Sequence, residues 1–114
     1  MVVLRSPNAG TTWENRTPPL ATVQSCRAIA INPSNTAEIY AGFGGSFGGG
    51  QVWVSTNNGL AGSWVNRSAG LPNTPVNAFV HDGTRALVGG GQLFGSQNFG
   101  LFSTINQGAT WTPL

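Results

Sequence analysis

Short apolar stretches recur along the whole chain, and turns rich in glycine, proline and asparagine separate them. The clearest examples are the stretches 27–31, 38–42, 51–54, 77–82 and 85–89. Apolar residues alternate with period two, and turn residues recur about every eight to twelve positions, which is typical of β-strands. Helices would need an apolar spacing near 3.6 residues and fewer glycines. The pattern therefore predicts an all-β protein without helices.

One turn pattern, Ser/Thr-x-Asn-x-Gly followed by Ser/Thr-Trp, occurs three times. The copies are Ser6–Trp13, Ser55–Trp64, which holds two extra residues, and Thr104–Trp111. They begin at residues 6, 55 and 104, so successive copies are 49 residues apart. A tandem repeat of this length is a unit of a few strands that stacks on its neighbours.

The match between repeats extends beyond this turn. Residues 64–68 echo 13–17, 77–82 echo 27–32, 85–89 echo 38–42 and 100–103 echo 51–54. With the strands of one repeat labelled A to D, the chain reads C-D, A-B-C-D, A-B-C-D, which predicts ten strands. We expect a single domain over 1–114, with a C-D hairpin at 1–17 and four-stranded units at 27–68 and 76–114. The glycine-rich segment 42–50 is predicted to be a loop between strands B and C.

The residues of the repeated turn suit a turn that satisfies its own backbone. Asn and Ser/Thr oxygens can accept hydrogen bonds from nearby N–H groups, and Gly takes the positive-φ position. The Trp is expected to fill the gap between one sheet and the next, with turn backbone as the partner of its indole N–H.

This turn resembles the Asp-box, or BNR, repeat of β-propellers, which reads Ser-x-Asp-x-Gly-x-Thr-Trp between the third and fourth strands of each blade. The resemblance covers the whole chain, including Gly70-Leu71-Pro72, although Asn8, Asn57 and Asn106 stand where Asp is usual. It implies β-propeller blades of four-stranded antiparallel sheets, in a ring that about two and a half blades leave incomplete. The family includes sialidases, xyloglucan-degrading hydrolases and sortilin-type receptors. In that family the box is structural and lies opposite the catalytic or ligand-binding centre.

Composition excludes several classes of partner. Charged residues make up 7% of the 114 residues, and the net charge of +2 rests on five widely spaced arginines. Such spacing forms no phosphate-binding patch, so nucleic acid is not an expected partner. No apolar run reaches membrane-spanning length, and no basic region followed by an apolar core opens the chain. We expect a soluble protein without a membrane partner, and bacterial secreted and cytoplasmic locations both stay open. Cys26 has no second cysteine to pair with.

The titratable residues predict no catalysis within one chain. Glycoside hydrolysis needs two carboxyl groups at a defined separation, and nothing in the sequence brings together any two of Glu14, Glu38 and Asp82. Tyr40, a possible counterpart of the sialidase nucleophile, has no evident base beside it. The rival reading is a remnant or subunit of a sialidase-like or xyloglucanase-like glycoside hydrolase that is active only when subunits pool residues. A gene fragment without a selected function is a third reading.

No metal or cofactor is expected. His81 has no second His or Cys at ligand spacing, which predicts a satisfied or exposed residue at a strand end. Neutral Asn side chains without a nearby carboxylate do not favour a tight calcium site in the repeated turns. Asn15-Arg16-Thr17 and Asn66-Arg67-Ser68 are glycosylation sequons, but their equivalent positions point to a structural role.

Propeller geometry predicts a ligand site on the face opposite the repeated turns, where the D-A and B-C loops meet. Aromatic rings beside amides suit a sugar or peptide, so the expected function is a non-catalytic module that binds or scaffolds a carbohydrate or protein. The predicted ligand-binding residues are Arg27, Phe47, Asn77, Gln92, Gln97 and Asn98, and Ser46, Phe94 and Phe99 lie in the same loops.

Self-association is the remaining expectation. Propellers generally have about four to eight blades, and a stack of two and a half would leave strand edges open. The opening and closing C-D hairpins are equivalent. We therefore predict a homo-oligomer, such as a ring of about six blades from three chains, with one hairpin of each overlap displaced or swapped.

Overall fold

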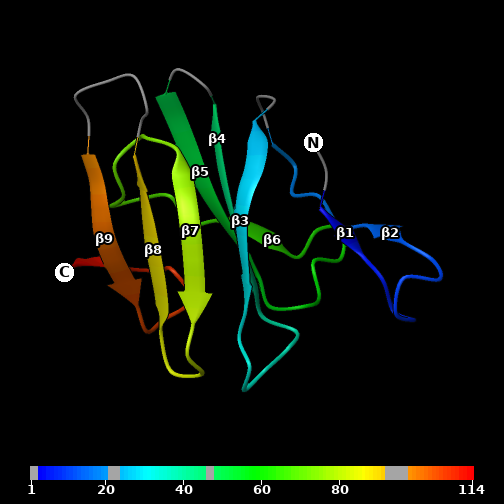
Figure 1. The fold of residues 1–114 in the computed structure, drawn as a ribbon. Helices are drawn as coiled ribbons and strands as arrows, with labels where there is room; N and C mark the ends of the chain where they lie inside the picture. The colour runs from blue at the N-terminus through cyan, green and yellow to red at the C-terminus, as the bar shows by residue number, and fades with distance from the viewer. Residues whose placement is uncertain (1–2, 21–23, 46–47, 92–97) are drawn as a thin grey trace.

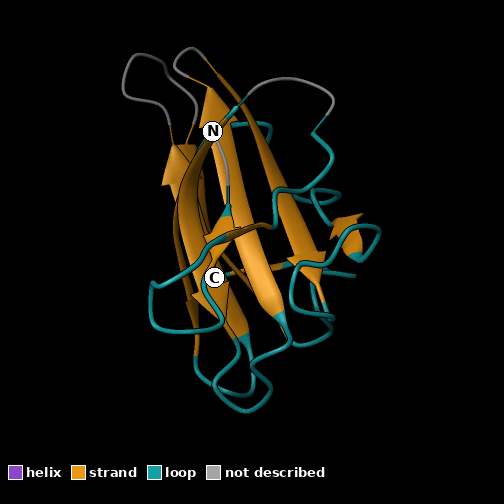
Figure 2. Cartoon of the chain, turned by 90° about the vertical axis from the view of Figure 1, so that its right-hand side faces the viewer, coloured by secondary structure: helices purple, strands orange, loops and turns teal. Residues whose placement is uncertain are grey.

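The structure is a computed structural model that describes residues 3–20, 24–45, 48–91 and 98–114, and these residues contain strands and turns but no helix. No helix able to cross a membrane is therefore present in the described part. Figures 1 and 2 show the strands, which are β1 (Leu4–Arg5), β2 (Glu14–Asn15), β3 (Ser25–Ile31), β4 (Ile39–Gly45), β5 (Gly48–Ser55), β6 (Trp64–Asn66), β7 (Val76–His81), β8 (Ala86–Gly91), β9 (Asn98–Thr104) and β10 (Thr112–Pro113).

The described strands form three antiparallel sheets in chain order. β1 pairs with β2, while β3-β4-β5-β6 and β7-β8-β9-β10 are four-stranded sheets in which each strand pairs with the next. None closes into a barrel. The predicted all-β fold, with complete four-stranded units preceded by a half unit, is confirmed, and the sheets stack as incomplete blades do.

Each contact between neighbouring sheets buries its own apolar core. Between the two four-stranded sheets the core consists of Ala30, Tyr40, Val52, Val54, Val76, Ala86 and Val88. Between the β1-β2 hairpin and the first four-stranded sheet it consists of Val3, Ile39, Ala41, Phe43 and Trp64. Strand β7 packs on both β3 and β4. The alternation along each strand thus places side chains in two separate cores, one on each face of the β3-β6 sheet.

The prediction of a loop over 42–50 is wrong, because β4 runs on to Gly45 and β5 begins at Gly48. The glycines of this segment make room for the neighbouring sheet. A Cβ at Gly42 would lie 2.3 Å from Cγ1 of Val76, and one at Gly44 would lie 2.4 Å from Cβ of Pro75. Here glycine serves close approach between sheets rather than a loose turn.

The repeated turns satisfy their own backbone as predicted. Oδ1 of Asn8 accepts a hydrogen bond from the Thr12 N–H at 2.8 Å, and Oδ1 of Asn106 accepts one from Thr110 at 3.0 Å. The expected glycines have positive φ, and so do the residues before them, which are Ala9, Asn58 and Gln107. In the second copy, which holds two extra residues, the hydroxyls of the two motif serines Ser55 and Ser63 lie 2.7 Å apart.

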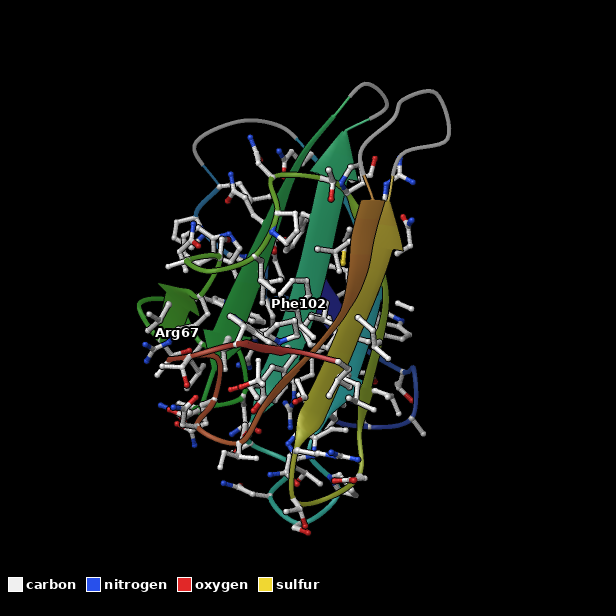
Figure 3. The ribbon with its side chains drawn as sticks, turned by 90° about the vertical axis from the view of Figure 1, so that its left-hand side faces the viewer. Arg67 and Phe102 are labelled. Atoms are coloured by element: carbon white, nitrogen blue, oxygen red, sulfur yellow. The ribbon has the colours of Figure 1, made fainter. Side chains whose placement is uncertain are left out.

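Two of the three repeat tryptophans link one sheet to the sheet before it. Trp64 is 7% exposed, and its Nε1 donates to the carbonyl oxygen of Arg16 at 2.9 Å. Nε1 of Trp111 donates to the carbonyl oxygen of Arg67 at 2.8 Å. Arg67 is labelled in Figure 3. The gap-filling role is confirmed for these two. It fails for Trp13, which is 61% exposed because no described sheet precedes it.

Candidate functional site

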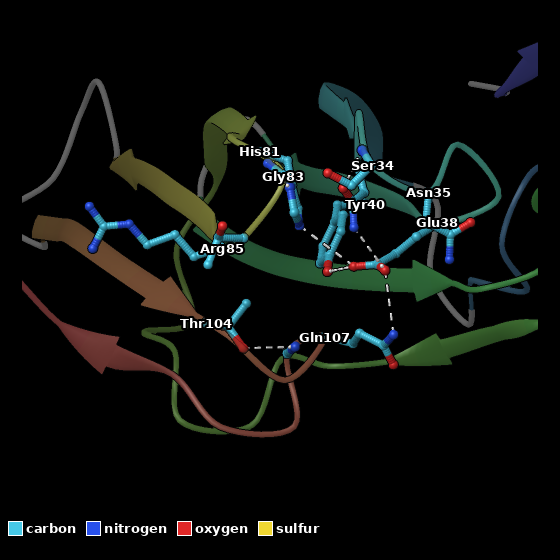
Figure 4. A network of polar contacts seen from close by, with 12 residues as sticks. Ser34, Asn35, Glu38, Tyr40, His81, Gly83, Arg85, Thr104 and Gln107 are labelled. Carbon is cyan, nitrogen blue, oxygen red and sulfur yellow. Dashed lines mark hydrogen bonds and ion pairs between the residues drawn. The ribbon is translucent and has the colours of Figure 1, made fainter.

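The most buried carboxylate of the described residues lies between the two four-stranded sheets. Glu38 precedes β4, is 5% exposed, and accepts hydrogen bonds from the Tyr40 hydroxyl, from Nδ2 of Asn32 at 3.2 Å and from Nε2 of Gln107 at 3.4 Å. Figure 4 shows this network. A buried carboxylate needs several such donors to offset the loss of water. Glu38 therefore ties its own sheet to the last repeated turn.

His81 completes this polar cluster from the second four-stranded sheet. Its Nδ1 accepts a hydrogen bond from the Gly83 N–H at 2.9 Å. In neutral His81 the proton therefore resides on Nε2, which faces Oε1 of Glu38 at 3.6 Å. The side chain of His81 is only 3% exposed. The expectation of a satisfied histidine is confirmed, and its partner is a carboxylate far away in the sequence.

Tyr40 lies at the centre of the cluster. Burial raises the pKa of its phenol well above the usual value, and the hydrogen bond to Glu38 and the nearby negative charge raise it further. Its ring packs 5.6 Å from that of Phe79 and 5.3 Å from that of His81. The expectation that Tyr40 has no base beside it is wrong, because its hydroxyl donates a hydrogen bond to Glu38, the residue just before β4.

The space beside this cluster is small. The cavity bordered by Glu38, Tyr40, His81 and Gln107 has a volume of about 120 Å³, below the roughly 300 Å³ at which small-molecule pockets begin. A sugar ring has no room at the Tyr40 hydroxyl. The cluster thus joins the two four-stranded sheets through polar contacts.

The other two carboxylates serve local structure. Glu14 pairs with the guanidinium of Arg16 and lies 3.7 Å from that of Arg5. Oδ1 of Asp82 accepts the N–H groups of Thr84 and Arg85, both at 2.9 Å, and these hydrogen bonds hold the pKa of Asp82 below its usual value. Among the described residues no group of three His, Cys, Asp or Glu side chains is placed to hold a metal ion.

The predicted ligand-binding residues are not gathered into one site by the part of the structure that is described. Arg27 and Asn77 are exposed at equivalent places on β3 and β7, and each donates to a carbonyl oxygen of its own sheet, at Gly44 (3.4 Å) and Gly91 (3.1 Å). The backbone of Asn98 begins β9 opposite Gly91. The side chain of Asn98, like residues Phe47, Gln92 and Gln97, lies outside the described residues.

A groove lies at the expected edge, but its described walls contain none of the predicted ligand-binding residues. Its volume is about 290 Å³, and its walls come from the start of β5 and the connection between β6 and β7: Gly50, Gln51, Val52, Ser68, Ala69, Leu71, Pro72, Asn73 and Val76. The repeated turn lies at the opposite end of β5, so the groove is on the edge away from it. The only sequence signal for the groove was the Gly70-Leu71-Pro72 segment.

One amide side chain, that of Asn73, borders this groove with its N–H groups available. Its Oδ1 accepts a hydrogen bond from the Gly50 N–H at 3.2 Å, which fixes the orientation of the amide. The NH₂ group of Asn73 has no partner among the described residues, so it can donate to a ligand. The side chain of Gln51 lies on the other face of β5, where its Oε1 accepts a hydrogen bond from Nε1 of Trp53 at 2.8 Å.

Comparisons of the chain with protein-family models, curated proteins and solved structures give no match.

Proposed function

We propose that the chain is a non-catalytic binding and scaffolding module of propeller-blade type, with its ligand in the groove between β5 and the β6-β7 connection. The observation that carries this proposal is the oriented amide group of Asn73 beside an apolar surface formed by Val52, Leu71 and Pro72. Concave sites with an apolar lining and a few oriented polar groups are the usual form of binding sites.

The groove favours a ligand that accepts hydrogen bonds and presents a flat apolar surface. Sugar hydroxyls with their ring C–H groups have this chemistry, and so do the carbonyls and side chains of an extended peptide. The described groove borders carry no charged side chain, which disfavours a strongly charged ligand. Carbohydrate and protein ligands therefore share the chemistry that the groove supports.

A glycan array and a peptide array distinguish the two sources. Asn73→Ala should weaken binding of the captured ligand about fivefold, since it removes one hydrogen bond of about 1 kcal/mol. Asn35→Ala is the matched control, because it removes an exposed amide from the β3-β4 turn at the opposite edge. Capture on neither array, or equal affinity of Asn73→Ala and the control, contradicts the groove as the binding site.

The enzyme alternative has one observation in its favour, the contact between the Tyr40 hydroxyl and Glu38. Such a pair is the arrangement in which a carboxylate activates a tyrosine nucleophile. Two observations argue against the enzyme. The raised pKa of Tyr40 keeps its hydroxyl protonated, and the small cavity leaves that hydroxyl covered. Hydrolysis of fluorogenic glycosides that disappears in both Tyr40→Phe and Glu38→Gln would favour the enzyme.

Self-association is the scaffolding half of the proposal. The two sheet-to-sheet contacts within the chain follow one plan, and apolar residues remain exposed at both ends of the stack, among them Ile29, Ile31, Val80 and Leu101. Further copies that extend the stack would cover them, and a ring of about six blades from three chains would leave no open end. Sedimentation equilibrium of the full chain tests this proposal, and a single-chain mass at the highest soluble concentration would contradict it.

A further inference from the structure

The β1-β2 hairpin occupies the place of the outer half of a blade. The N–H of Arg16 donates to the carbonyl oxygen of Val3 at 2.7 Å, and the equivalent Arg67 donates to Val52 at 2.8 Å. Trp64 donates to Arg16 as Trp111 donates to Arg67. The hairpin thus stacks on the first four-stranded sheet as β5 and β6 stack on the second.

The inner half of this blade position is open. Ile29 and Ile31 on β3 are each 50% exposed, whereas their equivalents on β7, Phe79 and His81, pack against the ring of Tyr40. A cavity of about 380 Å³ separates the hairpin from this part of β3, with Leu4, Ile29 and Ile31 in its walls. We name the surface formed by Ile29 and Ile31 the head face.

The other end of the stack presents the complementary surface, and Figure 1 shows the hairpin and β9 at opposite ends. Leu101 is 47% exposed although its equivalent Val52 is fully buried, and Val80 is 53% exposed although its equivalent Ala30 is 9% exposed. Leu87, the equivalent of Tyr40, also points to this side because it alternates with the buried Ala86 and Val88. We name the surface formed by Val80, Leu87 and Leu101 the tail face.

We propose that the sheet β7-β10 of one copy displaces the β1-β2 hairpin of a second copy and packs its tail face on the head face. This inference rests on the self-association proposed above and identifies the segment that is displaced. The occupant of the head face is thus a second copy of this chain, bound through the contact that already joins the two four-stranded sheets within one copy.

The hairpin is the segment that yields because its strands pair only with each other. Its removal breaks no strand ladder of the neighbouring sheet. Displacing β9-β10 from the other copy would instead break the β8-β9 ladder, which joins six residue pairs.

The incoming sheet also replaces what the hairpin provides. By repeat position, Leu101 takes the place of Val3 against the Ile39-Phe43 core, and the carbonyl oxygen of Leu114 takes the place of that of Arg16 as acceptor for Trp64. β7 and β8 then cover Ile29 and Ile31, which the hairpin leaves exposed. The exchanged contact therefore buries more apolar surface than the hairpin does.

The first experiment disables one face at a time. Val80→Glu/Leu101→Glu changes the tail face, and Ile29→Glu/Ile31→Glu changes the head face; all four side chains are about half exposed in a single copy, so both variants should keep the native near-ultraviolet circular dichroism. Each variant alone should lose self-association in sedimentation experiments. An equimolar mixture should form a dimer, because one intact head face and one intact tail face remain. Leu60→Glu, in the second repeated turn, is the matched control and should associate like the unchanged chain.

The second experiment tests which segment is displaced. Val3→Ser weakens the packing of the hairpin and changes neither face, so it should tighten self-association about tenfold. Association that persists but is weakened by Val3→Ser would overturn the displacement and leave self-association standing. A mixture of face variants that stays monomeric while the unchanged chain associates would overturn the head-to-tail contact. A single-chain mass for both the unchanged chain and Val3→Ser would overturn both proposals.

Discussion

The repeat tryptophans show how one residue type acquires three environments from its position in the stack. Trp64 is buried between sheets and Trp111 is half-buried, while Trp13 projects from the open end. The indole N–H of the first two reaches the preceding unit, at Arg16 and Arg67. The contribution of each tryptophan to stability should therefore follow its stacking, not its motif.

Alanine substitution at these positions is our first prediction. Trp64→Ala should lower the free energy of unfolding by about 3 kcal/mol or more, because it removes a buried ring and a sheet-to-sheet hydrogen bond. Trp111→Ala should cost less, and Trp13→Ala should stay within about 0.5 kcal/mol of the unchanged chain. Urea unfolding at low protein concentration measures the series. Equal losses at positions 13 and 64 would show that the turn, and not the stacking, needs the indole.

Titration of the single tyrosine is our second prediction. The ultraviolet absorbance of the phenolate should give Tyr40 a pKa above its ordinary value of 10.0 in the folded chain and near that value in urea. The folded form retains the proton where the unfolded form has lost it. The contribution of Tyr40 to stability is therefore complete below pH 10.0 and disappears as the pH rises through the folded pKa.

The loss should approach 1.4 kcal/mol per pH unit above pH 10.0 and be absent in Tyr40→Phe. Burial also raises the pKa of the Cys26 thiol, which gives a change of the same sign. A Cys26→Ser background in both proteins removes that contribution. A normal tyrosine titration in the folded chain would contradict the buried contact with Glu38.

At the scale of the elements, one pair of glycines shows the effect of sheet packing apart from the intrinsic strand preference of glycine. Gly42 on β4 and Gly89 on β8 hold equivalent repeat positions. A Cβ at Gly42 would meet Val76 at 2.3 Å, but a Cβ at Gly89 would meet nothing closer than 3.5 Å, in its own sheet. Neither glycine has a positive φ. The difference between them lies only in the sheet that covers β4 and in the absence of a described sheet over β8.

Our third prediction compares alanine at these two sites. Gly42→Ala should destabilise the chain by about 2 kcal/mol or more, because the added methyl overpacks the contact between sheets. Gly89→Ala should be neutral or slightly stabilising, since alanine restricts the unfolded chain and meets only ordinary contacts. Thermal unfolding of both variants measures the difference. Similar losses at both sites would mean that the close approach of Val76 is not what Gly42 serves.

The element scale also shows how far sequence patterns reach. Alternation along 27–31 and 77–82 predicted strands that the structure has at β3 and β7 within two residues at each end. The pattern wrongly predicts a loop over 42–50 because glycine has a low intrinsic strand preference. Local patterns do not contain the reason for those glycines, which is the approach of Val76 and Pro75 from another sheet.

At the scale of the molecule, the stack has strongly and weakly held parts. The central strands β4 and β8 each pair on both sides, whereas β1 and β2 pair only with each other. Local opening is easiest where few ladder bonds and contacts must break. The hairpin therefore should open without unfolding the two four-stranded sheets.

Hydrogen exchange is our fourth prediction. Backbone amides of β4 and β8 should exchange most slowly, and those of β1 and β2 should exchange several orders of magnitude faster. Mass spectrometry of peptic fragments is sufficient to measure the contrast. Protection of the hairpin equal to that of β4 would contradict its weak attachment and, with it, the displacement proposed above.

The candidate sites could be predicted from the sequence only in part. Nothing in the sequence brings Glu38, Tyr40 and His81 together, so the sequence predicts no cluster of these three titratable residues. The structure has a groove at the edge where the sequence predicts a ligand site, but predicted residues such as Phe47 and Gln92 lie outside the described residues. The described groove borders come from the start of β5, the β6-β7 connection and Val76, whose proximity depends on how the two sheets pack.

The sequence by itself determined the all-β class, the four-stranded unit and the self-satisfied turns, because these depend on alternation, positive-φ glycine and side chains within a few residues. Only the tertiary structure decided which tryptophans are buried, why β4 and β5 tolerate their glycines, and that Glu38 meets His81. These features arise where one sheet packs on the next. Equivalent residues such as Tyr40 and Leu87, or Gly42 and Gly89, occupy the same place in the repeat but differ in what covers them, and only the stacked arrangement supplies that cover.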